Sequence, residues 1–216
     1  MKKLILFDID GTLIKSSNEH KKAFSYAFKK VYNIEAEINF INYNGKTDQQ
    51  IIIEVLKKKG LNEKEILSKI KKCMNEMETF FENQNKNIKI QEGVNEILLH
   101  LNEKHILGLI TGNLEKIAKS KLDNINKYSY FKIGGFGSDG IKRSDLIKIA
   151  IKRAKKIYKF DEVIVIGDTP NDIIAGKEAK VKTIAVTTGE YSKYKLKKFN
   201  PDLIVENLKN KKMFKL

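Results

Sequence analysis

The chain has 216 residues, of which 41% are hydrophobic and 32% are charged, a balance typical of a globular protein with one core, or one core and a small inserted domain. Its apolar stretches are all shorter than the roughly 18–20 residues of a membrane-spanning helix, so we expect no membrane segment. The net charge is +15, but the lysines are scattered rather than gathered into one stripe, which argues against specific binding of nucleic acid.

Apolar runs alternate with helical patterns along most of the chain. The strongest runs are typical of buried strands and lie at 4–9, 106–110, 163–166 and 183–187, with weaker ones at 130–133 and 203–205. Between the later runs, helical periodicity covers 93–104, 114–125, 144–157 and 171–180. This alternation predicts an α/β fold with a parallel sheet.

Residues 16–83 depart from that alternation. Three helical patterns follow one another there, with no strand as strong as the first run. We therefore expect a small all-helical domain at residues 16–85, inserted after the first strand of a core domain formed by residues 1–15 and 86–216. A lysine-rich stretch at 209–215 is interpreted as a solvated end.

Polar residues follow three of the predicted strands. The first strand leads into DIDGT, which contains Asp8 and Asp10, the second strong run leads into TGN at 111–113, and the third leads into GDTPND, which contains Asp168 and Asp172. Ligands of open α/β sheets bind outside the carboxyl ends of the strands, so neighbouring strands would bring these residues into one crevice. Buried carboxylates need a cation, and Asp8, Asp10 and Asp168 suit Mg²⁺.

Structural alternatives exist for two of these motifs. DIDG could be only a turn, because Asp and Gly are common turn residues. Asp172 could serve a capping box, with Thr169 as the N-cap and Pro170 as the first helical residue. A calcium-binding EF-hand loop is excluded because Gly11 follows the second aspartate directly.

Taken together and in this order, DIDGT, TGN and GDTPND resemble the motifs of the haloacid dehalogenase-like superfamily, and the chain is most similar to its phosphoglycolate phosphatase-like members. The resemblance covers nearly the whole chain, and the helical insertion matches members with a helical cap at that position. It implies a Rossmann-like three-layer sandwich with a parallel sheet core. It also implies a Mg²⁺-dependent phosphatase that hydrolyses a small, phosphoglycolate-like metabolite through an aspartyl-phosphate intermediate.

The same resemblance implies roles for the motif residues. Asp8 would be the nucleophile, and Asp10 would be the general acid and then the general base. Mg²⁺ would be held by Asp8, by the backbone carbonyl of Asp10 and by Asp168, with Asp172 in support. Phosphate oxygens would be bound at the start of the helix that follows TGN, by a set comprising Thr111, Gly112 and Asn113.

The chain departs from the family in the third motif, which usually offers a lysine, often followed by proline. The sequence GSDGIKRSDLIKIA has no proline and places Lys142 beside Arg143. Arg143 directly precedes the helical pattern and can bind phosphate bidentately, so we favour Arg143 over Lys142, with solvation of both as the alternative. In the insertion, Lys46 and His20 are candidate substrate contacts, against the alternatives of a helix-capping turn and an ordinary surface histidine.

Two other functions stay open. A phosphomutase of the β-phosphoglucomutase kind would share Asp10 and the cap, and that family has a histidine at the place of His20. A non-catalytic basic binding protein on the same scaffold is the more distant alternative. We expect a small phosphorylated metabolite as the partner, no specific nucleic acid, no membrane, and a monomer with a dimer as the alternative. The single cysteine, Cys73, cannot form an internal disulfide, which favours the cytoplasm.

Overall fold

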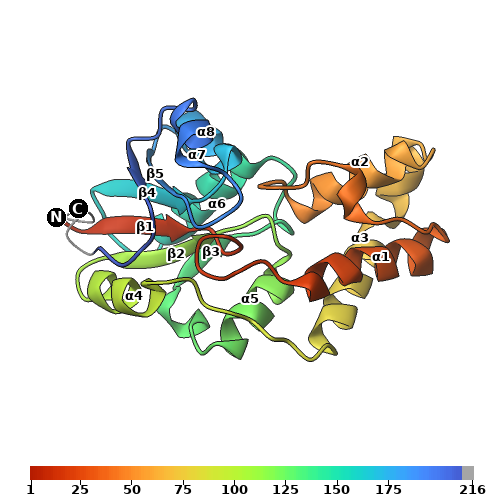
Figure 1. Ribbon diagram of the computed structural model, residues 1–216, viewed down its shortest axis with the longest axis horizontal. Helices are drawn as coiled ribbons and strands as arrows, with labels where there is room; N and C mark the ends of the chain where they lie inside the picture. Colours follow the sequence, from red (N-terminus) through yellow and green to blue (C-terminus); the bar gives the residue numbers. More distant parts are fainter. Residues whose placement is uncertain (211–216) are drawn as a thin grey trace.

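The computed structural model describes residues 1–210, so most of the lysine-rich stretch at 209–215 lies outside the described residues. One six-stranded sheet has the order β3-β2-β1-β4-β5-β6, and every neighbouring pair is parallel (Figure 1). The strands are β1 (Lys3–Phe7), β2 (Ile106–Ile110), β3 (Ile133–Gly135), β4 (Glu162–Gly167), β5 (Lys182–Val186) and β6 (Leu203–Val205). The expected parallel sheet is confirmed.

Helices connect these strands, as parallel pairing requires. In the sheet domain they are α4 (Val94–Asn102), α5 (Glu115–Asn124), α6 (Arg143–Lys155), α7 (Pro170–Glu178) and the short α8 (Lys193–Lys197). The insertion after β1 contains α1 (Asn18–Tyr32), α2 (Asp48–Lys58) and α3 (Glu63–Glu82). Single 3₁₀ turns lie at Ile38–Phe40 and Tyr128–Tyr130. Within residues 1–210, none of the helices has the length and apolar character needed to cross a bilayer.

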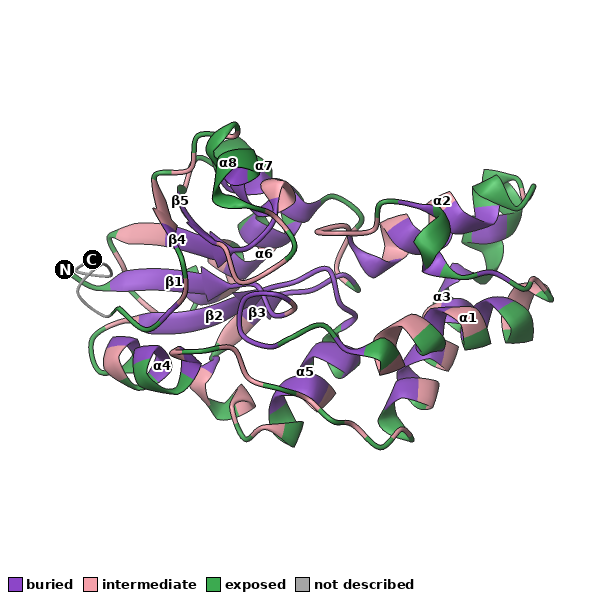
Figure 2. Ribbon diagram, in the orientation of Figure 1, coloured by how far each residue is buried: buried purple, intermediate pink, exposed green. Residues whose placement is uncertain are grey.

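The central strand shows why the fold has three layers. Successive side chains of a strand point to opposite faces. Ile5 and Phe7 pack into a cluster with residues of α4 and α5, whereas Leu4 and Leu6 pack into a second cluster with residues of α6 and α7. All residues of β1 are buried, and the strands form the buried centre of the sheet domain in Figure 2. Because β1 carries apolar side chains on both of its faces, helices pack on both faces of the sheet. This arrangement confirms the Rossmann-like sandwich.

The three inserted helices pack on one another at the carboxyl edge of the sheet (Figure 1). Their buried cluster includes Phe24, Phe28 and Phe81, and it is joined by Leu114, the N-cap residue of α5, and by Ile117 of α5. We call the segment with α1, α2 and α3 the cap. The cap thus has a core of its own that is continuous with one helix of the sheet domain. The division of the chain at residues 16 and 85 remains a prediction.

The cap loop before α2 lies directly against the sheet domain. The Asp48 amide donates to the Gly112 carbonyl at 2.8 Å, and Thr47 Oγ1 donates to the Ile141 carbonyl at 2.9 Å. A Cβ on Gly112 would lie 2.2 Å from the Lys46 carbonyl oxygen, so only glycine permits this approach. The structure is therefore that of a closed cap.

Candidate active site

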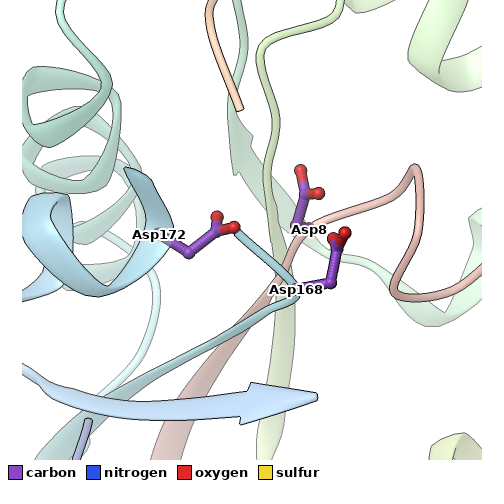
Figure 3. A group of neighbouring side chains, drawn as sticks. All are labelled: Asp8, Asp168 and Asp172. Atoms are coloured by element: carbon purple, nitrogen blue, oxygen red, sulfur yellow. The ribbon is translucent and has the colours of Figure 1, made fainter. Parts of the chain in front are cut away.

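Three carboxylates meet at the carboxyl edge of the sheet. Asp8 follows β1, Asp168 follows β4, and Asp172 lies in the first turn of α7 (Figure 3). One oxygen of each lies within 4.8 Å of the others, and all three side chains are buried. The strands β1 and β4 are neighbours, which explains why motifs about 160 residues apart converge.

Close backbone approach shapes the site around Asp168. Thr12 Oγ1 donates to Asp168 Oδ1 at 3.0 Å. A Cβ on Gly11 would lie 2.3 Å from Asp168 Oδ2, and one on Gly189 would lie 1.8 Å from the same atom. Gly11 also has a φ of 83°, in the left-handed region that favours glycine. These two glycines leave the room that the Asp168 carboxylate occupies.

Arg143 is the buried cation of this cluster. Its Nη2 donates to Asp8 Oδ1 at 2.7 Å and to Asp172 Oδ1 at 2.5 Å, and its Nε donates to Asp172 Oδ1 at 3.0 Å. Lys142 is the N-cap residue of α6, and its side chain is 60% exposed and pairs with Glu178. The structure therefore brings Arg143 to the carboxylates and leaves Lys142 on the surface.

Asp172 has a structural role as well. Its Oδ2 accepts from the Thr169 amide at 3.0 Å and from Thr169 Oγ1 at 2.7 Å, which completes the capping box that GDTPND suggests. Its Oδ1 is occupied by Arg143. Both oxygens of Asp172 are thus engaged, so its closest link to the other two carboxylates runs through Arg143.

The electrostatics of the cluster call for a second cation. Burial raises the pKa of the Asp8 carboxyl to about 7, and burial with repulsion from Asp8 and Asp172 raises the pKa of Asp168. Arg143 supplies one positive charge for three carboxylates. Asp8 Oδ2 and Asp168 Oδ2 accept no hydrogen bond from residues 1–210. An all-oxygen donor set of this kind fits Mg²⁺.

Asp10 belongs to a separate network on the cap side of the site. The Lys121 ammonium contacts both of its carboxylate oxygens, at 2.9 and 2.6 Å, and Asn113 Nδ2 donates to its Oδ2 at 2.8 Å. Lys121 also donates to Asn113 Oδ1 at 2.8 Å. Burial would raise the pKa of Asp10, but the charge of Lys121 and the hydrogen bonds from Lys121 and Asn113 outweigh burial and lower that pKa.

Two cap residues continue this network. His20, from α1, lies with Nδ1 3.2 Å from Lys121 Nζ and with Nε2 3.1 Å from Asp48 Oδ2, from α2. The same Asp48 oxygen accepts from the Leu114 amide at 2.9 Å. His20 is therefore a partly buried link between the cap and the sheet domain, not an ordinary surface histidine.

The predicted phosphate-binding segment lies on the floor of the same cavity. Thr111 and Asn113 are buried, and Thr111 Oγ1 accepts from the Asn113 amide at 3.2 Å and from Asn113 Nδ2 at 2.6 Å. The cavity has a volume of about 120 Å³. Its lining brings together the candidates from strand tips and cap, Asp8, Asp10, His20, Lys46, Thr111, Gly112, Asn113, Arg143 and Asp168. Lys46 lines it but pairs with Glu54 of α2.

Sequence reasoning missed Lys121 and Asp48. Lys121 is one of 42 lysines and arginines, so composition could not single it out. A signal was present, because Ile117, Ala118 and Leu122 define the buried face of α5 and Lys121 lies on that face. Asp48 could not be recognised as a functional residue, because acidic residues are common in the first turn of a helix.

Comparisons with known proteins point to one family. The family model of haloacid dehalogenase-like hydrolases matches residues 5–186. A Caldanaerobacter subterraneus relative named after the pyrophosphatase PpaX is 30% identical, over 94% of this chain and 90% of its own length. The phosphoglycolate phosphatase of Aquifex aeolicus is 29% identical, over 87% of this chain and 85% of its own. A solved Clostridium acetobutylicum structure, described as a phosphatase, has a TM-score of 0.78 at 23% identity and covers 100% of both chains.

A parallel sheet with acidic strand tips and a family model that matches most of the chain define the class: this chain belongs to the haloacid dehalogenase-like hydrolases. The relatives of this chain are named as phosphatases. Within the family, this chain is therefore a phosphatase.

Proposed function

We propose that this phosphatase hydrolyses a small phosphorylated metabolite in two steps, through an aspartyl-phosphate on Asp8. The observation that supports this best is the arrangement of two separately held carboxylates on one cavity. Asp8 contacts Arg143, whereas Asp10 contacts Lys121 and Asn113. Two carboxylates in different environments suit two roles, nucleophile and proton carrier.

In the first step, Asp8 attacks phosphorus while Asp10 gives a proton to the leaving oxygen. In the second step, Asp10 takes a proton from the water that attacks the phosphoaspartate. Arg143, with the Thr111 hydroxyl and the Gly112 amide, binds the phosphoryl oxygens, where negative charge is spread in the transition state, and Asn113 holds the Thr111 hydroxyl in place.

Asp8 and Asp168 would hold Mg²⁺ together with the backbone carbonyl of Asp10, and Asp172 would support the site by fixing Arg143. The ion would neutralise charge between the carboxylates and the phosphate. The same group of residues argues against a non-catalytic binding protein, because three buried carboxylates with one arginine are costly without a bound cation.

The cavity limits the substrate. Its volume of about 120 Å³ is well below the roughly 300–1,000 Å³ of typical small-molecule pockets. A phosphoryl group with a leaving group of a few atoms suits it, as in pyrophosphate or phosphoglycolate, which the names of the relatives mention. A phosphomutase must accommodate a sugar with two phosphates, so the small volume of the cavity supports hydrolysis over mutase activity.

The first test is hydrolysis of p-nitrophenyl phosphate with and without Mg²⁺, followed by a panel of pyrophosphate, phosphoglycolate and sugar phosphates. We expect Mg²⁺-dependent hydrolysis and a preference for the smallest substrates. Acid-quenched enzyme should carry labelled phosphate on Asp8. Isomerisation of β-glucose 1-phosphate at a rate above hydrolysis would overturn the proposal in favour of the mutase.

A further inference from the structure

Lys121 is a fully buried lysine whose side chain is 0% exposed. Its position on α5 has no part in the motifs that define the family resemblance. A lysine buried without partners would lose its charge or destabilise the fold. The contacts of Lys121 should therefore offset the cost of burying its ammonium group. The contacts of the ammonium group show what this residue does.

An ammonium group has three N–H donors and no acceptor. Lys121 Nζ has three kinds of partner: the Asp10 carboxylate, Asn113 Oδ1 at 2.8 Å and His20 Nδ1 at 3.2 Å. The three donors and three partners match, so the group is saturated. Asn113 is saturated too, because Nδ2 donates to Asp10 and to Thr111 while Oδ1 accepts from Lys121. The Asp10 carboxylate is therefore held from two directions by groups that are themselves fixed.

The same donor count assigns the histidine tautomer. Lys121 can only donate, so His20 Nδ1 accepts and carries no proton. His20 Nε2 then donates its proton to Asp48 Oδ2. The ring is held in place by Phe24 and Phe81 of the cap, with ring centroids at 5.2 and 6.0 Å. The histidine thus packs against cap side chains and contacts the sheet domain through Lys121.

We propose that Lys121 is a positioning residue that fixes the Asp10 carboxylate, and that His20 makes this position depend on the closed cap. The inference rests on the proposed function, in which Asp10 moves protons. When the cap opens, His20 leaves with α1 and Lys121 loses one of its three acceptors. The ammonium is then free to move, and Asp10 is held less firmly. Proton transfer from Asp10 to the leaving oxygen, and from the attacking water to Asp10, is thereby coupled to closure over the substrate.

The test compares Lys121→Met, which keeps a straight chain without charge, with Lys119→Met, an exposed lysine of the same helix near Tyr128. General acid–base groups contribute about 10²–10⁴ in rate, so loss of positioning should slow turnover of p-nitrophenyl phosphate at least about tenfold. Because nitrophenolate leaves without a proton, Lys121→Met should keep the initial burst and slow only the breakdown of the phosphoenzyme, with KM within about threefold. Lys119→Met should match the parent.

The link to the cap is tested by His20→Leu, alone and combined with Lys121→Met. His20→Leu should slow turnover by about three- to tenfold and keep the burst, and it should add less than about twofold to the loss caused by Lys121→Met. His20→Leu alone carries the test if circular dichroism shows that Lys121→Met is unfolded. The inference would be overturned if Lys121→Met or His20→Leu left turnover unchanged, or if either variant lost the burst together with turnover. It would also be overturned if the effects of the two substitutions multiplied in the double variant. An inactive parent would instead overturn the proposed function, and the inference with it.

Discussion

Arg143 Nη2 lies 2.7 Å from Asp8 Oδ1, so the cation of the third motif contacts the proposed nucleophile directly. Asp172 accepts from the same nitrogen at 2.5 Å and fixes its orientation. In the proposed mechanism, a guanidinium held in this way would already lie where charge develops on the phosphoryl oxygens and would need no reorganisation during the reaction.

Replacement of Arg143 should therefore be costly, whereas replacement of its neighbour should not. We expect Arg143→Ala to lose at least about tenfold in turnover, because removing one preorganised donor typically costs about 10²–10³. Arg143→Lys should recover only part, since the bidentate fork is gone. Lys142→Ala should stay within a few-fold of the parent because Lys142 is exposed and pairs with Glu178.

The measurement for Arg143 is steady-state kinetics together with a thermal melt. Loss of one partner of a buried ion pair costs about 3–5 kcal/mol of stability. The melt therefore shows how much of each variant is folded, so that lost activity can be separated from unfolding. A large loss in Lys142→Ala with little change in Arg143→Ala would show that the placement of the phosphate is wrong.

The two aspartates of the first motif should fail in different ways. Asp8→Asn should abolish turnover because the nucleophile is removed. Asp10→Asn should still release a burst of nitrophenolate from p-nitrophenyl phosphate, and then turn over slowly because the water lacks its base. The exposed Asp145→Asn serves as the matched control on α6. Near-normal turnover of carefully purified Asp8→Asn would rule out the aspartyl-phosphate mechanism.

Activity should depend on a divalent cation. A chelator should abolish hydrolysis and Mg²⁺ should restore it, whereas Ca²⁺ should support it poorly because its coordination is longer and less regular. Asp168→Ala should raise the Mg²⁺ requirement strongly or eliminate activity, which a Mg²⁺ titration measures. Full activity of the parent in chelator would contradict this assignment.

A single methyl group should disturb the same site. Gly189→Ala would place a Cβ 1.8 Å from Asp168 Oδ2, and the carboxylate would have to move. Residues that position metal ligands typically change metal affinity by about 10–100-fold, and we expect a rise of that order in half-saturating Mg²⁺. Gly140→Ala is the control, because its nearest neighbour lies at 3.6 Å. Equal Mg²⁺ requirements in both variants would contradict the prediction.

Much of this arrangement could be predicted because the local signals agree with one another. The apolar runs at 4–9 and 163–166 coincide with the neighbouring strands β1 and β4, so the polar residues that follow them converge. The capping box at Thr169 gave the start of α7 to the residue. In both cases the pattern is set by burial and backbone hydrogen bonding, which short stretches of sequence express directly.

Long-range polar contacts could not be predicted in this way. Nothing in the sequence pairs Lys121 with Asp10, because that contact depends on how α5 packs beside the segment that follows β1. The helix α8 has only five residues, too few to show a helical period. The positions of Lys142 and Arg143 follow from the helix start at Arg143, since adjacent residues diverge by about 100° around a helix axis; the phosphate-binding role of Arg143 stays a prediction.

The carboxylate of Asp172 begins α7 with one oxygen and orients Arg143 with the other. The first turn of α7 therefore cannot fray without releasing the guanidinium from its position. Local unfolding at this one helix end would remove the oriented arginine while the sheet stays folded, and hydrogen exchange of the Thr169 and Asp172 amides, both bonded in this turn, should follow that opening.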